Sequence, residues 1–420
     1  QNIPMHGTEP QAETKMSVYI HGKEFPLDIG KDYVLYEAGE ESYTPDPIEA
    51  VFVGYGIVAP EFDYNDYQQI DVEGKIVVML EGEPYSEDDD FFDGEKRTIY
   101  SYPKSKQRIA ISRGAYGSII IPNLAESSLL HWQSKKTDFV FENVSLAYSA
   151  SSNFSALMNP VAAQKIFSET TTSLIDIYQQ HLKNKVFSFP LGVNIFFNGK
   201  ISRRDFVSSN ILGIIEGSNP ELKDEYLIIS AHYDHLGVGP AIKGDSIYNG
   251  VMDNAIGVAG LLEMARVIKN MQPSPERSII FLLVTGEEKG ALGSSYYTDH
   301  PPVPLYKTIA NVNVDGLAFM DSIRSVIGVG TDYSTFDSYL EEAAGKNGLF
   351  VTEIPDMFKR EGAFSLSDQI SFANAGIPSI LVIEGPDFVN YSRDKAIEKM
   401  MKYSQTVYHT PFDDLKQPMD

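Results

Sequence analysis

Four apolar runs in the second half of the chain constrain its fold more than any other feature. They show no alternation of polar and apolar residues, and they cover residues 226–231, 278–284, 309–314 and 379–383. A strand with one solvent-exposed face alternates polar and apolar residues, so a continuous apolar run predicts a strand that is buried on both faces. Helix-like segments lie between the runs, which is typical of a mostly parallel sheet covered by helices. We therefore expect an α/β domain with a mostly parallel mixed sheet flanked by helices over residues 201–420.

One covering helix can be placed from its periodicity. Residues 255–270 carry apolar side chains at three- and four-residue steps, which predicts a single buried face. The residues of that face are Val258, Leu261, Leu262, Ala265 and Ile268. Asp253 or Asn254 precedes the segment and could accept a hydrogen bond from one of its first N–H groups, as helix-capping residues do.

Residues 1–200 have a different texture. Short strand-like runs at 51–58, 75–80 and 118–121 alternate with polar loops, and one helix-like stretch covers about 104–113. This β-rich pattern is typical of an accessory domain. We expect three parts: an N-terminal segment at 1–45 that packs with the accessory domain, the accessory domain itself at 46–200, and a catalytic domain at 201–420.

Charge and composition exclude several classes of protein. The chain has 420 residues, with 34 Lys and Arg against 58 Asp and Glu, and a formal net charge of −24. Phosphate-rich partners would be repelled, which argues against nucleic acid and anionic membranes. No stretch approaches the ~20 apolar residues of a membrane span. The sequence begins with Gln1 instead of Met, so we expect a processed or trimmed product and an extracytoplasmic location.

Polar residues follow three of the four predicted strands. His232 comes at the end of the first run, the pair Glu287-Glu288 just after the second, and Asp315 directly after the third. The carboxyl ends of parallel strands meet at one edge of a sheet, where ligands bind. Asp253 lies in the connection after the first strand, and we expect the late His409 to return to the same edge.

This set of side chains suits two divalent metal ions. The chain has no Cys, so a metal must be held by His, Asp, Glu or backbone oxygens. Two ions ~3.5–4 Å apart need several ligands, one of them a carboxylate that bridges. Carboxylates and imidazoles suit zinc, with manganese or cobalt as substitutes. Asp234 could accept the second ring N–H of His232, and a spare carboxylate of Glu287-Glu288 could act as general base.

Each of these residues also has an ordinary structural interpretation. A His after a strand is often a loop or core residue, adjacent glutamates often lie on the surface, and an Asp before a helix often caps it. Agreement among three strand ends outweighs these interpretations. The other histidines show no comparable placement, and we interpret them as structural: His6, His21, His131, His181, His235 and His300.

At these residues the chain resembles the M28 family of dinuclear zinc peptidases, over about residues 205–415. The matching segments are 232–237 (HYDHLG), 249–254, 286–294 (GEEKGALGS), 313–315, 367–378 and 408–411 (YHTP). The resemblance implies a zinc-dependent exopeptidase fold. Residues about 46–195 are also similar to the protease-associated (PA) domain, through 54–56 and 113–117, and such a domain would cap the catalytic crevice and restrict substrate size.

Metal-ligand roles follow from the resemblance. It implies that His232 and Asp315 bind one zinc ion, that Glu288 and His409 bind the other, and that Asp253 bridges both.

The resemblance also implies roles for residues that do not bind the metals. Glu287 would be the general base, Asp234 would support His232, and Tyr408 would polarise the scissile carbonyl. Gln369 replaces a residue that is often aromatic or His in relatives, so we expect it to line the substrate pocket.

We therefore expect a metallo-aminopeptidase that releases N-terminal residues from peptides. A carboxypeptidase or dipeptidase of the same fold is the alternative, and it would need an Arg for the terminal carboxylate. Candidates by chain position are Arg324, Arg360 and Arg393. A non-hydrolytic binding ectodomain and a one-metal acyltransferase such as a glutaminyl cyclase are disfavoured by the complete ligand set. The sequence assigns neither an oligomeric state nor a preferred residue at the cleavage site.

Overall fold

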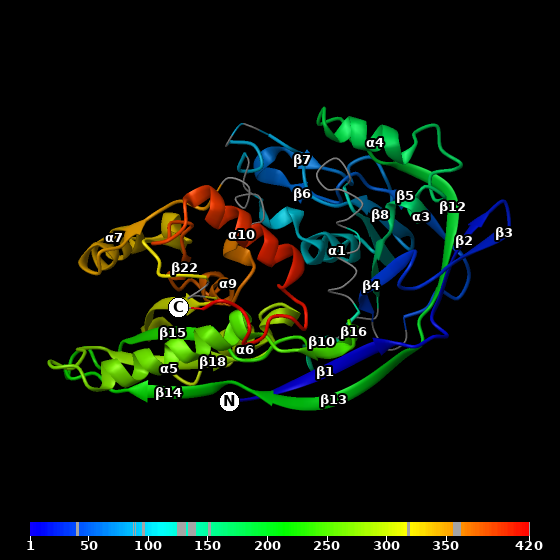
Figure 1. Cartoon of the computed structure of the whole chain (residues 1–420). Coiled ribbons are helices and arrows are strands. Elements are labelled where there is room, and N and C mark those ends of the chain that lie inside the picture. The colour runs from blue at the N-terminus through cyan, green and yellow to red at the C-terminus, as the bar shows by residue number, and fades with distance from the viewer. Residues whose placement is uncertain are drawn as a thin grey trace. The chain divides into compact units, whose positions relative to one another are not determined.

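The computed structural model describes residues 1–38, 42–86, 88, 90–94, 97–123, 132, 140–149, 153–316, 320–355 and 363–419 (Figure 1). His131 and Arg360 lie outside the described residues. The chain divides into two units, which we call the C-terminal unit (Gln1–Met5 with Phe206–Asp420) and the N-terminal unit (His6–Asp205). None of the helices that the structure describes combines the length and the apolar character that crossing a membrane requires.

The C-terminal unit contains a seven-stranded sheet with the order β14-β18-β15-β19-β22-β20-β21. The four apolar runs of the sequence form β15, β18, β19 and β22, which run parallel to one another, and β14 and β20 pair antiparallel with β18 and β22. The expected mostly parallel mixed sheet is therefore confirmed. The strand bounds are Ile211–Ile215 (β14), Tyr226–His232 (β15), Ser278–Val284 (β18), Thr308–Val314 (β19), Ser325–Val329 (β20), Phe350–Val351 (β21) and Ser379–Glu384 (β22).

Helices cover both faces of this sheet. On one face Ile229 and Ala231 of β15 pack in a cluster with Leu261, and on the other Ile228 packs in a cluster with Tyr297 and Phe372. Both faces of β15 are thus buried, which explains why its sequence does not alternate. The helices of this unit are α5 (Ile256–Lys269), α6 (Leu292–Asp299), α7 (Phe336–Lys346), α9 (Gln369–Asn374) and α10 (Arg393–Thr406), and β16 (Gly237–Ile242) pairs with β17 (Asp245–Tyr248).

Helix α5 matches the predicted helix except at one core position. Val258 and Leu261 pack against the sheet, together with Ala265 and Ile268. Leu262 is 57% exposed, so its assignment to the buried face is wrong. At 3.6 residues per turn Leu262 lies about 100° around the helix from Leu261, which carries it off the apolar stripe. Ahead of the helix, Oδ1 of Asn254 accepts a hydrogen bond from the N–H of Gly257 at 3.1 Å.

The N-terminal unit is built on an eight-stranded mixed sheet with the order β3-β2-β12-β5-β8-β9-β11-β4. Its strands are Lys15–Ile20 (β2), Lys23–Leu27 (β3), Tyr33–Ala38 (β4), Ile48–Phe52 (β5), Ile76–Leu80 (β8), Gly117–Ile121 (β9), Phe154–Met158 (β11) and Phe189–Asn198 (β12), and its helices are α1 (Pro103–Ser112), α3 (Pro160–Ala163) and α4 (Leu174–His181). Smaller sheets join β10 (Asn143–Leu146), β1 (Asn2–Pro10) and β13 (Ile201–Ser209), and β6 (Val58–Ala59) with β7 (Tyr64–Asn65). The expected β-rich texture of this region is present.

Candidate metal centre

Neighbouring strands of the C-terminal unit deliver ionisable side chains to one edge of the sheet. His232 is the last residue of β15, and its register partner on β18 is Val284. The 3₁₀ turn η4 (Glu287–Lys289) begins three residues beyond Val284, and Asp315 directly follows β19. Because these strands are parallel and in register, their carboxyl ends lie level, and the side chains that follow them can meet.

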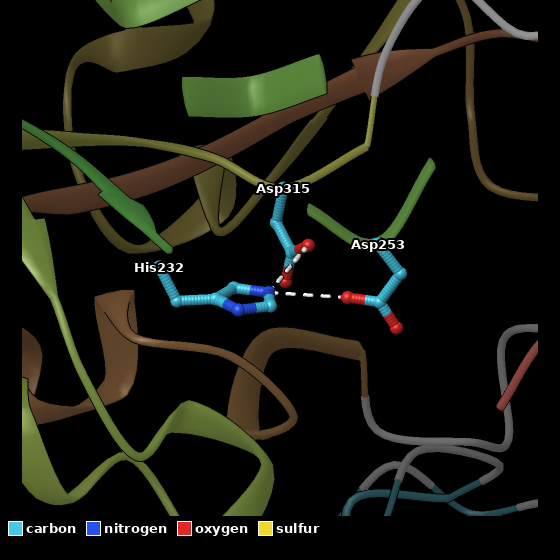
Figure 2. A group of neighbouring side chains, drawn as sticks. All are labelled: His232, Asp253 and Asp315. Atoms are coloured by element: carbon cyan, nitrogen blue, oxygen red, sulfur yellow. Dashed lines mark hydrogen bonds and ion pairs between the residues drawn. The ribbon is translucent and has the colours of Figure 1, made fainter. Parts of the chain in front are cut away.

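The first group of side chains surrounds the ring of His232. Its Nε2 lies 3.1 Å from Oδ1 of Asp253 and 3.2 Å from Oδ1 of Asp315. Figure 2 shows the imidazole pointing at both carboxylates, which come from the turn before α5 and from the end of β19. One atom from each of the three residues lies within 4.8 Å of the others, as a shared cation would require.

The second group lies on the other side of the Asp253 carboxylate. Nε2 of His409 is 3.3 Å from Oδ2 of Asp253 and 3.1 Å from Oε2 of Glu288. His235 joins this group, because its Nδ1 lies 2.5 Å from Oε1 of Glu288. The two oxygens of Asp253 therefore face different histidines, His232 and His409, which is the geometry of a bridging carboxylate.

These distances fit a metal centre. Zinc binds His nitrogen and carboxylate oxygen at about 2.0–2.2 Å with tetrahedral geometry, which places neighbouring ligand atoms roughly 3.3–3.5 Å apart. The four contacts between imidazole nitrogens and carboxylate oxygens that Asp253 and its neighbours make range from 3.1 to 3.3 Å. Imidazoles and carboxylates are also the donors that zinc, manganese and cobalt accept in proteins. The residues present therefore fit metal binding on both sides of the Asp253 carboxylate, with His232 and Asp315 on one side and Glu288 with His235 or His409 on the other.

The electrostatics of the cluster keep its potential ligands ionised. Burial by itself would raise the pKa of Asp253, but hydrogen bonds with His232 and His409 hold it well below its ordinary value. Burial likewise opposes ionisation of Glu288, and hydrogen bonds with His235 and His409 lower its pKa. Burial would lower the pKa of His232, yet its bonds to carboxylates raise it well above the usual range. The proton of His232 thus supplies positive charge that a metal ion would supply in its place.

Glu287 behaves differently from its neighbour Glu288. Burial, and next the negative charge of Asp315, raises the pKa of Glu287 well above its ordinary value. Tyr408 is 44% exposed as a residue, but desolvation of its hydroxyl and nearby carboxylates raise its pKa, so this group stays protonated. Both side chains line the same cavity as the cluster. The Tyr408 ring stacks on that of His409, with centroids 3.8 Å apart.

The support of His232 differs from the prediction. Its Nδ1 donates a hydrogen bond to the backbone carbonyl of Asp234 at 2.9 Å, so the expectation that the Asp234 carboxylate would accept it is wrong. The bond still fixes the tautomer, because a carbonyl accepts only from a protonated Nδ1, which leaves Nε2 for a cation. The carboxylate of Asp234 instead accepts hydrogen bonds from the Thr285 hydroxyl at 2.9 Å and the Gly286 N–H at 2.7 Å, just before Glu287.

Two sequence-based interpretations of individual side chains are wrong. The interpretation of His235 as a structural residue is wrong, because its Nδ1 contacts Glu288 and it belongs to a group that could hold a metal ion; its position three residues after His232 is the available signal. Gln369 was expected to line the pocket, but it is fully buried and bonds to Asn313 at 3.0 Å and to the carbonyl of Phe364 at 2.7 Å. A buried amide satisfies its polar groups internally, which explains why Gln369 turns away from the cavity.

Sequence reasoning also missed two supporting residues. The Ser367 hydroxyl donates to Oδ2 of Asp315 at 2.7 Å, and the Asp413 carboxylate accepts from the N–H groups of Met252 and Asp253 at 3.0 and 3.1 Å. Ser367 lies in a segment that carries the family resemblance, whereas Asp413 has no local signal. Such outer partners orient metal ligands.

A cavity of about 540 Å³ opens beside the cluster. Five carboxylates line it, and none of the lining residues within the described part of the chain is Lys or Arg. Its described lining residues are Met252, Asp253, Glu287, Glu288, Gly290, Asp315, Gly316, Ser365, Leu366, Glu384, Met400, Tyr403, Tyr408 and His409. The cavity is of a size that binds small molecules or a few residues of a peptide.

A mixed α/β sheet with this His and carboxylate cluster at its strand ends defines an α/β domain with a candidate metal centre. The family model "Peptidase family M28" matches residues 210–420, and the chain belongs to this family. The resemblance found in the sequence is therefore confirmed for the C-terminal unit.

Similar proteins include several aminopeptidases. The chain is 30% identical to Aminopeptidase YwaD of Bacillus subtilis (strain 168) over 218 residues, which is 50% of this chain and 40% of that protein. It is 29% identical to Aminopeptidase NAALADL1 of Mus musculus over 243 residues, 54% of this chain and 30% of that protein. The chain thus spans less than half the length of these two relatives. A solved aminopeptidase structure from Aneurinibacillus sp. strain AM-1 matches 95% of this chain and 80% of its own, with a TM-score of 0.52 and 18% identity, which concerns the fold.

Proposed function

We propose that this protein is a metallo-aminopeptidase that releases N-terminal residues from peptides. The observation that carries the proposal is the cavity beside the metal-binding cluster, which is lined by five carboxylates and, among the described residues, by no Lys or Arg. Asp253, Glu288 and Asp315 would be neutralised by bound metal ions, so the direction of binding rests on the absence of a described Lys or Arg that a C-terminal carboxylate would need, whereas a free peptide N-terminus, a cation, needs none. The aminopeptidase names of two relatives agree with this direction.

The carboxypeptidase alternative lacks its key residue in the described part of the chain. Recognition of a terminal carboxylate favours a bidentate Arg. Arg393 instead forms an ion pair with Asp387 at 2.8 Å, and neither it nor Arg324 is among the described residues of the cavity. Arg360 lies outside the described residues.

The proposal assigns two zinc ions to the cluster, with manganese or cobalt as substitutes. His232 and Asp315 would hold one ion, Glu288 and His409 the other, and Asp253 both, in line with the contacts at 3.1–3.3 Å. When bound, the ions polarise the scissile carbonyl and lower the pKa of an attacking water. A second complete ligand group counts against the one-metal acyltransferase and against a non-hydrolytic ectodomain.

Two further side chains act in the reaction: one transfers the proton, and the other stabilises the negative charge that develops on the carbonyl oxygen. Glu287 takes a proton from the attacking water and passes it to the leaving amine, a role that suits a carboxylate whose pKa burial raises above its ordinary value. The Tyr408 hydroxyl, which its raised pKa keeps protonated, donates a hydrogen bond to the carbonyl oxygen as negative charge develops there. The carbonyl of Asp234 holds the ring of His232 in place throughout.

A rate panel with and without a chelator tests the proposal. Peptides of one sequence are compared with both ends free, with the N-terminus acetylated and with the C-terminus amidated. We expect turnover of the free and C-blocked peptides, little turnover of the acetylated one, and loss of all activity with chelator. Equal rates for acetylated and free peptides would contradict the aminopeptidase assignment. The extracytoplasmic location stays a prediction, which fractionation of expressing cells tests.

A further inference from the structure

Glu384 is a carboxylate of the cavity that belongs to neither metal-binding group. It is the last residue of β22, which runs parallel to β19 with Val382 opposite Val314. Two residues beyond that pair, Glu384 and Gly316 reach the same edge of the sheet, and both line the cavity. The same strand-end arrangement that places Asp315 therefore places a further carboxylate one strand away.

Glu384 is partly exposed, but one of its two carboxylate oxygens is buried and unsatisfied. Its Oε2 has no hydrogen-bond partner among the described residues. Burial raises its pKa, as expected for a carboxyl group without a cation beside it. A carboxylate at the wall of a cavity that leaves one oxygen without a partner is more favourable when a cationic group of a ligand pairs with it.

The cavity that Glu384 lines has apolar wall residues that suit an aliphatic stem. Met252, Leu366 and Met400 line the cavity together with the ring of Tyr403. The Tyr403 hydroxyl lies close enough to Glu384 that this carboxylate, after burial and other acidic neighbours, helps to raise its pKa. Lys and Arg side chains combine an apolar stem with a cationic head, so they match apolar walls that carry one acid. Unbranched Met side chains also adapt to long flexible stems.

We propose, on the basis of the aminopeptidase function above, that the cavity selects peptides whose first residue is Lys or Arg, and that Glu384 recognises the side-chain cation. The α-ammonium group of the substrate is attached next to the reacting carbonyl, so it must lie at the metal-binding cluster. A side-chain cation is carried away from that carbonyl by its stem. Glu384, which stands outside both metal-binding groups, is placed for the second cation and not the first.

The test compares kcat/KM for lysyl, arginyl, norleucyl and glutamyl p-nitroanilides. Norleucine has the stem of Lys without its ammonium group, so the Lys/norleucine ratio isolates the charge. We expect a ratio of at least about 10 in the wild-type protein, the size of a charge-assisted hydrogen bond in a buried site. Glu384→Gln should bring the ratio to within about 2 of unity while norleucine turnover changes less than about twofold. Glu384→Leu should favour norleucine.

The matched control is Glu398→Gln, which removes a carboxylate that lies on α10 and pairs with Lys395 at 2.7 Å. It should leave the ratio unchanged. The ratio is measured within one protein preparation, so it does not depend on the folded fraction of a variant. An unchanged ratio in Glu384→Gln, or a wild-type ratio of 1 or less, would overturn the proposal. An equal decrease of kcat/KM for the lysyl and norleucyl substrates would also overturn it. That result would mean that Glu384 binds the α-ammonium group or stabilises the folded protein.

Failure of this inference can be told apart from failure of the proposed function. If the norleucyl substrate is turned over at or above the rate of the lysyl substrate, the protein is an aminopeptidase that does not prefer a basic first residue. Absence of turnover for all four free-amino substrates in zinc-loaded protein would instead contradict the aminopeptidase function itself.

Discussion

Nδ1 of His235 lies 2.5 Å from Oε1 of Glu288, in a contact where both side chains are almost completely buried. The other oxygen of Glu288 faces His409 at 3.1 Å. His235 therefore contacts Oε1 of Glu288, the oxygen that does not face His409. We infer that it orients this carboxylate, as outer partners orient ligands in metal sites.

His235→Ala should weaken metal binding by roughly 10–100-fold, the usual effect of losing such a partner. Turnover should recover when zinc is supplied in excess, because the five proposed ligands remain. Competition titration with a chromophoric chelator measures the affinity. His300→Ala, a change of a histidine that caps the end of α6, is the control and should leave affinity unchanged. Loss of one whole metal equivalent that excess zinc does not restore would show that His235 is itself a ligand.

Glu287→Gln should lower kcat by about 10²–10⁴-fold while both metals stay bound. The amide keeps the size of the side chain but cannot carry the proton, and general-base catalysis contributes a factor of this order. Elemental analysis of the purified variant gives the metal content, and steady-state kinetics gives the rate. Near-wild-type turnover would remove the assigned role.

Asp253→Ala should lose both metal and turnover. Its two oxygens face His232 and His409 at 3.1 and 3.3 Å, so truncation opens both groups at once. Because a ligand that binds only the folded state stabilises it, the variant should also lose the increase in Tm that zinc produces in the wild-type protein. Calorimetry with and without zinc measures this shift. Ser367→Ala, which removes one hydrogen bond to Asp315, should reduce the shift without abolishing it; retention of two metals by Asp253→Ala would contradict the bridging role.

The stability of the N-terminal unit should fall as the pH rises from about 4.5 to about 7. Burial raises the pKa of Glu83 from 4.5 to about 7, against hydrogen bonds from Thr98 that lower it. The folded unit thus keeps a proton that the unfolded chain releases, so the contribution of Glu83 is fully present below its unfolded pKa and is lost as the pH passes the folded value. The change is at most roughly 3 kcal/mol.

Urea denaturation followed by the fluorescence of Trp132 measures this dependence, because the chain has a single Trp and it is buried in the N-terminal unit. Glu83→Gln should flatten the curve between those pH values. Glu13→Gln, an exposed position, should leave it as in the wild-type protein. Asp66, whose pKa burial raises to about 6, leaves a residual slope in both variants. Parallel curves for wild type and Glu83→Gln would contradict the prediction.

Much of the C-terminal fold could be predicted from local patterns. The runs at 226–231, 278–284, 309–314 and 379–383 became β15, β18, β19 and β22, because a strand covered by helices on both faces needs apolar side chains in both directions. The side chains that follow these strands could be predicted to meet, because parallel strands end at one edge. His232 and Asp315 could be identified in this way, and Nε2 of His232 lies 3.2 Å from Oδ1 of Asp315.

The residue types at the strand ends could be predicted without coordinates, because hydrophobic periodicity and strand direction are local properties of the chain. The identity of the atoms that meet depends on the folded structure. The backbone carbonyl of Asp234, and not its carboxylate, reaches His232; Gln369 turns inward; and Glu384 faces the cavity with a buried oxygen that no described residue satisfies. Those outcomes depend on side-chain rotamers and on segments that return from other parts of the chain. The Asp234 carboxylate is held by Thr285 and Gly286, 51 and 52 residues away, and Gln369 bonds to Asn313, 56 residues away, and no local pattern encodes the position of such a partner.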